Sequence, residues 1–164
     1  GHDWAKLAAA RDTEVTRLSG IYDKLLKGAG AQTYWGRATL LDAHTISIDD
    51  QRVTAERIVI ATGGKPNRLD MPGAELGLIS DDLFTLGKMP RRVAILGSGY
   101  IAVEFAGLLR GLGAEVDLVY RASLPLRGFD EDIRMALAEA MTAQGIRLNA
   151  DVMPTRITQA SGEL

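Results

Sequence analysis

Apolar and polar positions divide the chain into a helical start, a middle of short alternating runs, and a final region of apolar runs and helical spacing. After Asp3, a candidate helix cap, apolar residues recur with helical periodicity from Trp4 to Leu25, and Gly28 should end that helix. Four short runs between turn residues then predict a small antiparallel meander. They are Gln32 to Trp35, Arg37 to Leu41, His44 to Ile48 and Arg57 to Ala61.

The segment between the meander and the final region has the composition of a loop. Thr62 to Gly73 is rich in glycine and proline, Ser80 or Asp81 is expected to cap a short helix ending at Leu86, and Pro90 marks a predicted domain boundary. Three other residues receive structural interpretations. Trp35 is expected as a buried meander aromatic, His44 in a surface turn, and Asp130 as the cap of a helix containing Ile133.

The clearest pattern lies between residues 92 and 120. Arg92 to Leu96 has the apolar, β-branched character of a buried parallel strand, and a glycine turn follows it. Tyr100 to Leu112 then has helical spacing, with Ala102 and Ala106 small enough to let the helix lie close to a sheet. Glu115 to Tyr120 supplies a second strand. The three elements form a predicted β-α-β unit of about 30 residues.

The turn Gly97-Ser98-Gly99 is typical of a dinucleotide-binding site. Glycines allow the backbone to approach a pyrophosphate, and the amides at the start of the following helix can donate hydrogen bonds to it. A glycine match alone is weak evidence in a chain with 18 glycines, and Ala102 stands where the third glycine is usual. The flanking strand and helix favour the dinucleotide interpretation. The alternative is a β-α-β crossover that binds no ligand.

The end of the second predicted strand indicates NADPH rather than NADH. An NAD-binding protein normally has an acidic residue there, which binds the ribose 2′-hydroxyl group, whereas this chain has Tyr120. Arg121 follows at once, and Arg127 lies on the same loop after Pro125. Two guanidinium groups could converge on one 2′-phosphate and give about a hundredfold preference for NADPH. Otherwise they are two solvated surface arginines.

Composition narrows the classes of function. A net charge of -2 with mixed signs gives no cationic surface for nucleic acid, and no apolar run approaches the ~20 residues of a membrane span. The first residues do not resemble an export signal, so we expect a cytoplasmic protein without a membrane partner. The chain has no cysteine, which excludes a disulfide or cysteine nucleophile, and His2 and His44 are too few for a metal site.

Three motifs together resemble the FAD-dependent pyridine nucleotide-disulfide oxidoreductase family, class I, and within it the middle third of the glutathione reductases. They are the segments from Ile58 to Pro66, from Gly97 to Gly107 and from Arg121 to Asp130, in family order and spacing. The resemblance implies an α/β fold: a Rossmann-like β-α-β unit, plus part of an FAD-binding domain with a helix and antiparallel meander. Residues 1–90 would be the incomplete rear part of the FAD-binding domain, and residues 91–164 an NADPH-binding domain shortened at its C-terminus.

The resemblance also implies roles for residues of the NADPH site. Arg121 and Arg127 would hold the 2′-phosphate, Tyr100 would be a movable lid over the nicotinamide, and Glu104 would approach the nicotinamide carboxamide. Taken without the family, Tyr100 is a locally packed aromatic and Glu104 a solvated charge. The full set of NADPH-binding candidates is Gly97, Ser98, Gly99, Tyr100, Ile101, Ala102, Glu104, Arg121 and Arg127.

For the flavin, the resemblance implies that Ala38, Thr62 and Gly63 contact FAD, although each motif alone would be a tight turn. Ile21 and Tyr22 resemble the helical pair that lines the glutathione disulfide cleft. From spacing alone, Tyr22 is a core aromatic on an amphipathic helix.

The expected parent is therefore an NADPH-dependent flavoprotein that reduces glutathione disulfide in cell redox homeostasis, and that dimerises through a C-terminal domain outside this sequence. The redox cysteines should lie upstream, so this chain alone is expected to be inactive. Three alternatives stay open. The chain could be a stand-alone nucleotide-binding or redox-sensing module, a shortened chain with an exposed flavin-facing surface, or part of a trypanothione or mercuric reductase.

Overall fold

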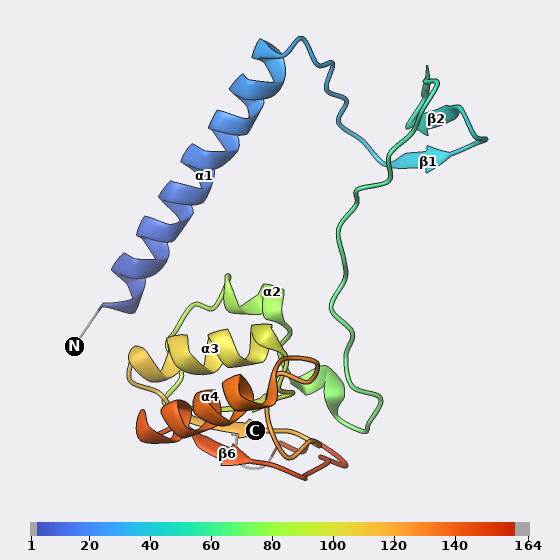
Figure 1. The fold of residues 1–164 in the computed structure, drawn as a ribbon. Helices are drawn as coiled ribbons and strands as arrows, with labels where there is room; N and C mark the ends of the chain where they lie inside the picture. The colour runs from blue at the N-terminus through green and yellow to red at the C-terminus, as the bar shows by residue number, and fades with distance from the viewer. Residues whose placement is uncertain (1–2, 160–164) are drawn as a thin grey trace. The chain divides into compact units, whose positions relative to one another are not determined.

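The computed structural model describes residues 3–159 and divides into two compact units, of which each is treated by itself (Figure 1). The meander unit is Ala8–Lys65. The parallel-sheet unit contains the described residues before Ala8 and those from Pro66 onward. The boundary between these units, at Lys65 and Pro66, does not coincide with the family boundary expected near residue 90. The assignment of residues 1–90 and 91–164 to two family domains therefore stays a prediction.

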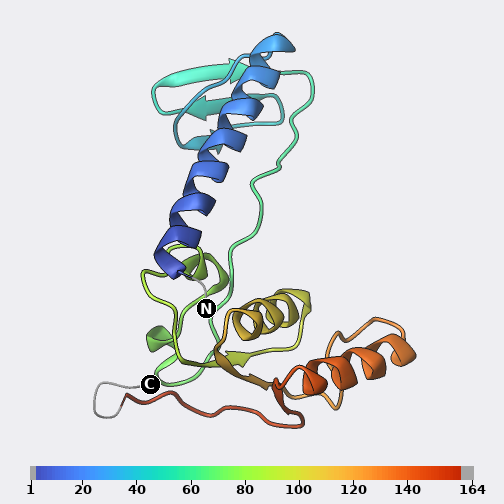
Figure 2. The same ribbon diagram turned by 90° about the vertical axis from the view of Figure 1, so that its left-hand side faces the viewer.

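The meander unit contains most of α1 (Trp4–Gly28) and a three-stranded antiparallel sheet in the order β1-β2-β3 (Figure 2). The strands are β1 (Ala38–Leu40), β2 (Thr45–Ile48) and β3 (Gln51–Thr54). A tight turn joins β2 to β3, with Asp49 in a left-handed conformation at φ 49°. This two-residue connection makes the pair a hairpin, in which Ile46 pairs with Val53.

Two of the four strands predicted for the meander are wrong. No strand forms at Gln32 to Trp35 or at Arg57 to Ala61. The third strand of the observed sheet is instead β3, which was not predicted. Trp35, predicted to be buried, is 86% exposed, and so is Val59. An apolar run forms a strand only where a neighbour accepts its backbone hydrogen bonds, and within the described residues these two runs have no such neighbour. His44 lies in an exposed bend before β2, as predicted.

The parallel-sheet unit is built on three parallel strands in the order β4-β5-β6, with helices between them. Its elements are η1 (Ala74–Leu76), α2 (Ser80–Leu83), β4 (Arg92–Leu96), α3 (Tyr100–Gly111), β5 (Glu115–Val119), α4 (Glu131–Ala143) and β6 (Arg147–Asn149). The predicted β-α-β unit is confirmed, because β4 pairs with β5 in parallel from Arg92 opposite Glu115 to Leu96 opposite Val119.

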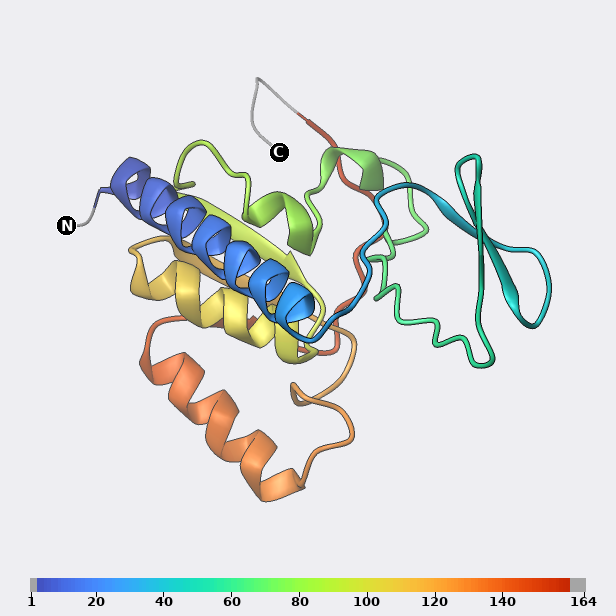
Figure 3. The ribbon, with the colours of Figure 1, turned by 90° about the horizontal axis from the view of Figure 1, so that it is seen from above.

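The core of this unit lies between the sheet and the helices α3 and α4, which are neighbours in space (Figure 3). Alternate residues of β5 face it, so that Val116 and Leu118 are fully buried. Ala106 on α3 is also fully buried and Ala102 is packed against the core, as expected for a helix close to a sheet. The other buried members of this core are Leu109, Ala114, Tyr120, Met141 and Ile146.

Two predicted helix caps have different outcomes. The Asp130 carboxylate accepts hydrogen bonds from the amides of Asp132 and Ile133 at 3.0 and 3.4 Å, so this cap of α4 is confirmed. The short helix α2 ends at Leu83, before the predicted Leu86, and neither Ser80 nor Asp81 caps it. Instead, the Asp82 carboxylate accepts a hydrogen bond from the Ile79 amide at 2.8 Å.

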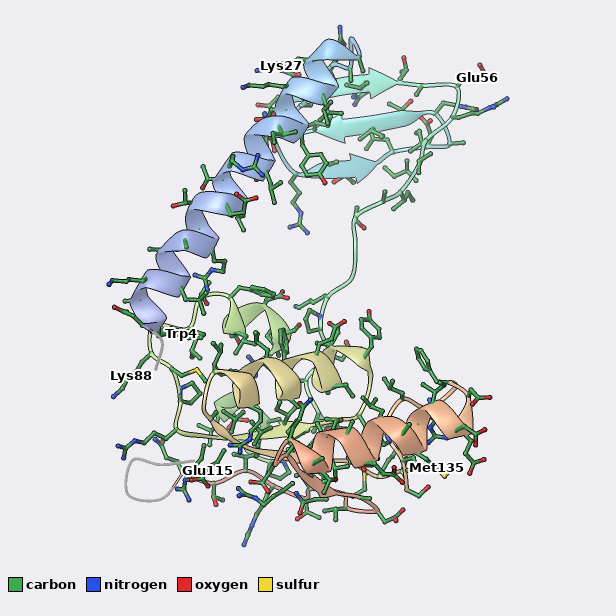
Figure 4. The ribbon with its side chains drawn as sticks, turned by 60° about the vertical axis from the view of Figure 1, so that its left-hand side comes forward. Trp4, Lys27, Glu56, Lys88, Glu115 and Met135 are labelled. Carbon is green, nitrogen blue, oxygen red and sulfur yellow. The ribbon has the colours of Figure 1, made fainter. Side chains whose placement is uncertain are left out.

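At the amino end of the sheet, one guanidinium group joins the ends of two helices. Arg110, in the last turn of α3, donates from Nε to the Gln144 carbonyl at 2.8 Å and from Nη1 to the Ala114 carbonyl at 3.3 Å. Gln144 is the C-cap of α4. Arg110 therefore holds the segments that lead into β5 and β6, at the end of the sheet where Glu115 is labelled in Figure 4.

The face of the sheet turned away from the core carries an ion pair between neighbouring strands. Arg147 on β6 donates from Nε and Nη2 to the two oxygens of Asp117 on β5, at 2.8 and 2.6 Å. The Arg147 guanidinium, and to a smaller degree the Asn149 amide, lowers the pKa of the Asp117 carboxyl below its usual value.

We predict that this pair makes the stability of the chain dependent on acid pH. A lowered native pKa means that the ion pair stabilises the fold above the unfolded pKa of about 3.9 and that this contribution is lost as the pH falls through the native value. Asp117→Asn should therefore lower the urea midpoint at neutral pH and leave it unchanged near pH 2. Glu139→Gln, an exposed change on α4, is the control. An equal effect of Asp117→Asn at both pH values would contradict the prediction.

Candidate functional site

The glycine turn joins the end of β4 to the start of α3, where the parallel strands end. The Gly97 amide donates to the Val119 carbonyl at 2.9 Å, which fixes the turn to the end of β5. Gly97 has a φ of 125°, a conformation that side chains strongly disfavour, whereas Gly99 is extended with φ -73° and ψ 174°. A Cβ atom added to either glycine would meet no heavy atom within 4 Å. The space in front of this turn is therefore open.

Helix α3 presents its N-terminus at this open space. Gly99 is its N-cap, has no side chain to cap the first amides, and accepts a hydrogen bond from the Val103 amide at 3.1 Å. The free amides and the positive end of the helix dipole suit a phosphate group. These residues therefore fit the pyrophosphate of a dinucleotide: the backbone supplies donors, and a side chain on Gly99 would occupy the space that a phosphate needs.

A loop from Arg121 to Phe129, here called the arginine loop, connects β5 to α4 and is hydrogen-bonded to the glycine turn. The Leu126 amide donates to the Ser98 carbonyl at 2.8 Å. At the beginning of the loop, the Asp151 amide donates to the Ala122 carbonyl at 3.2 Å. Its Pro125 is among the most completely buried residues of the chain. The loop is thus attached both to the segment after β6 and to the predicted phosphate turn.

Arg121 and Arg127 both lie on the arginine loop and are exposed. Within residues 3–159, the structure records no hydrogen bond or ion pair for either guanidinium group. Tyr120, the residue that replaces the acid of NAD-binding proteins, is buried, and this burial, together with the charge of Asp151, raises the pKa of its phenol. The side chain of Tyr120 therefore adds no negative charge beside the arginines. Whether the two guanidinium groups converge on one phosphate stays a prediction.

The remaining nucleotide candidates lie on the first turns of α3. Tyr100 is 63% exposed, and Glu104, four residues later, is also exposed, so the two side chains share one face of the helix. Ile101 is exposed as well. Ala102 instead packs against the core, which explains why a small residue stands where the third glycine is usual.

The flavin and substrate candidates all belong to the meander unit. Ala38 begins β1 and pairs with Ile48 on β2. Thr62 and Gly63 lie in a segment without helix or strand, where Gly63 has a φ of 73°. Ile21 and Tyr22 are exposed on α1, so the interpretation of Tyr22 as a core aromatic is wrong within the described residues. The roles of these five residues toward FAD and a disulfide stay predictions.

Sequence reasoning missed a residue that shapes the candidate site. Arg134 on α4 donates hydrogen bonds to the carbonyls of Pro125 and Leu124 in the arginine loop. Its position four residues after the cap Asp130 was a weak signal, because such a position places a side chain over the start of the helix. The strand β6 was missed too, although Ile146 and Leu148 alternate with polar residues after Gly145.

Two classes of feature are absent from the described residues. Residues 3–159 contain no group of three or more His, Asp or Glu side chains that could hold a metal ion. None of the helices in the same part of the chain has the length and apolar character that crossing a membrane requires.

Comparisons with known proteins agree with this geometry. Residues 2–164 match the family described as pyridine nucleotide-disulphide oxidoreductase. Glutathione reductase from Nostoc sp. is 43% identical over 157 residues, which are 96% of this chain and 34% of that protein. Trypanothione reductase from Leishmania donovani is 38% identical over 170 residues, covering 96% of this chain and 35% of that protein. The chain thus spans about a third of the length of these curated relatives.

A solved structure gives the same result for the fold. The HOCl-induced flavoprotein disulfide reductase RclA from Escherichia coli, in its Cu(II) complex, matches 98% of this chain and 38% of its own, with a TM-score of 0.87 and 26% identity. The family match extends over nearly the whole sequence and includes both the glycine turn and the meander. This chain therefore belongs to the pyridine nucleotide-disulphide oxidoreductase family.

Proposed function

We propose that the chain carries the NADPH-binding site, and part of the flavin-binding fold, of a larger NADPH-dependent flavoprotein disulfide reductase. The observation that carries the proposal is the hydrogen bond from the Leu126 amide to the Ser98 carbonyl. This bond places the loop that contains Arg121 and Arg127 beside the glycine turn. NADPH carries two anionic groups, a pyrophosphate and a 2′-phosphate. The glycine turn would bind the pyrophosphate, and the neighbouring loop would bind the 2′-phosphate.

Each part of the site would have its own task. The backbone from Gly97 to Ala102 would bind the pyrophosphate, and Arg121 and Arg127 would bind the 2′-phosphate. Tyr100 would cover the nicotinamide position and exclude water from it, and Glu104 would orient the carboxamide. When bound, NADPH supplies the hydride that reduces a flavin.

The whole protein would reduce glutathione disulfide and act as a cytoplasmic homodimer, with FAD held in part by Ala38, Thr62 and Gly63. Ile21 and Tyr22 would line the disulfide cleft. The glutathione reductase from Nostoc sp. supports this choice, and the trypanothione reductase from Leishmania donovani supports trypanothione disulfide as the alternative. A stand-alone nucleotide-binding module is the second candidate, because the chain contains no cysteine with which to reduce a disulfide.

We predict that the purified chain binds NADPH, retains negligible FAD and reduces no glutathione disulfide. The physical reason for weak flavin binding is that the chain corresponds to about a third of its relatives, so that most contacts to FAD would come from other segments. A flavin absorbance spectrum and an NADPH-consumption assay measure these properties. Stoichiometric flavin in the purified chain would contradict the prediction.

The activity of the parent needs a separate experiment. Turnover of the full-length protein with glutathione disulfide and with trypanothione disulfide, compared by kcat/KM, decides between the two substrates. A parent whose coding sequence lacks redox cysteines, and that binds NADPH without turnover, would instead favour the module.

A further inference from the structure

The guanidinium group of Arg134 is hydrogen-bonded to the backbone of the arginine loop. Arg134 lies at the end of the first turn of α4, immediately before Met135, which is labelled in Figure 4. It donates from Nε to the Pro125 carbonyl at 2.7 Å and from Nη2 to the Leu124 carbonyl at 2.9 Å. Both hydrogen bonds are partly buried. One planar fork therefore fixes two consecutive peptide groups of the loop.

The peptide groups that Arg134 holds lead directly to Arg127. Leu126, the next residue, donates its amide to Ser98 and has a φ of 53°. Gly128, on the other side of Arg127, has a φ of 95°. A left-handed conformation at leucine is unfavourable and persists only where the surroundings enforce it. Leu126 is held here by its own backbone hydrogen bonds to Ser98 and Phe129, and the segment before it by the two hydrogen bonds from Arg134 and the burial of Pro125.

We propose that Arg134 is a positioning residue that sets the discrimination between NADPH and NADH. This positioning role rests on the proposed function, because the discrimination between NADPH and NADH would arise at Arg121 and Arg127. By holding the backbone on the N-terminal side of Arg127, Arg134 fixes where that guanidinium group lies relative to the glycine turn. Without it, the loop would have to be ordered each time a 2′-phosphate binds, which lowers the affinity for that phosphate alone.

The test compares Arg134→Met with Arg110→Met in the full chain. Arg110 is a matched control, because it also donates from one guanidinium group to two carbonyls, those of Gln144 and Ala114, but at the opposite end of the sheet. Each variant loses one positive charge and two hydrogen bonds of the same kind. Titration calorimetry with NADPH and with NADH gives the ratio of the two dissociation constants, and thermal unfolding gives the loss of stability.

We expect Arg134→Met to reduce the preference for NADPH about tenfold through weaker NADPH binding, with NADH affinity changed less than about twofold. Arg110→Met should leave the preference unchanged at a similar loss of melting temperature. Arg134→Lys keeps the charge but cannot bond both carbonyls in the same way, so it should lose most of the preference too. Full NADPH preference in Arg134→Lys, with loss in Arg134→Met, would mean simple charge attraction and would overturn the positioning role.

A measurement without nucleotide separates failure of this inference from failure of the proposed function. Hydrogen exchange reports the protection of the Leu126 amide, which we expect to fall at least about tenfold in Arg134→Met and to stay unchanged in Arg110→Met. Unchanged protection in Arg134→Met overturns the inference, whatever the nucleotide affinities are. A wild-type chain that binds NADPH and NADH equally well overturns the proposed NADPH preference, and with it the role of Arg134 in discrimination.

Discussion

Replacing Arg121 by alanine and Arg127 by leucine should lower the affinity for NADPH about a hundredfold and leave the weaker affinity for NADH nearly unchanged. A charge-assisted hydrogen bond contributes about 1.5 to 3 kcal/mol, and two such contacts, reduced by solvent exposure, give this difference. The effect should be confined to NADPH because NADH has a hydroxyl group where NADPH has the 2′-phosphate. Titration calorimetry of the variant with both nucleotides measures it.

The matched control removes the same charge elsewhere. Arg52→Ala with Arg57→Leu changes two exposed arginines of the meander unit and should leave both affinities as they are. If the Arg121 and Arg127 variant lost affinity for both nucleotides equally, the arginines would serve the pyrophosphate or the fold, and their assignment to the 2′-phosphate would be wrong.

Gly99→Ala should weaken the binding of NADPH and of NADH alike, by at least about tenfold. Gly99 has a backbone conformation that alanine adopts without strain, and the added Cβ would meet no protein atom within 4 Å. The methyl group would instead occupy the space that the pyrophosphate needs next to the amides of α3. Because both nucleotides contain this group, the NADPH preference should not change.

Folding and binding can be separated at this position. Alanine is a poorer N-cap than glycine, so Gly99→Ala should cost less than about 1 kcal/mol of unfolding free energy. Gly97 is unsuitable for this test, since its φ of 125° would strain any side chain. Gly107→Ala, within α3 and also free of contacts within 4 Å, is the control that should retain both affinities. Unchanged affinity in Gly99→Ala would rule out a pyrophosphate at the turn.

The sequence predicted the β-α-β unit closely because its signals are local. The strand at Arg92–Leu96 is found with the expected bounds, and the helix from Tyr100 ends one residue before the predicted Leu112. Both elements have an apolar pattern of the right period and a glycine at the adjoining turn. The same is true of the cap at Asp130, whose hydrogen bonds join residues two and three positions away.

Predictions failed where an element depends on distant residues. The run from Arg57 to Ala61 is as apolar as a buried strand, but a strand needs a partner, and its pattern does not reveal whether one is present. The strand β3 forms because the turn at Asp49 and Asp50 brings Gln51 to Thr54 back alongside β2. A turn signal was therefore more informative here than an apolar run.

For the site, the sequence offered candidate binding residues but not what holds them in place. Residue type and order along the chain make Gly97, Arg121 and Arg127 candidates, and their binding role stays a prediction. The hydrogen bonds from Leu126 to Ser98 and from Arg134 to Pro125 join segments whose proximity depends on the tertiary fold. No local pattern predicts such contacts, although they attach the loop that carries the two arginines.

The proposed NADPH site depends on recognition of the ribose 2′-phosphate by the arginine loop. The most direct measurement is a calorimetric titration of the unmodified chain with adenosine 2′,5′-bisphosphate and with adenosine 5′-monophosphate, which differ in that phosphate alone. We predict that the bisphosphate binds about a hundredfold more tightly, and that this advantage shrinks as salt is added. Equal dissociation constants for the two nucleotides would contradict 2′-phosphate recognition by the arginine loop.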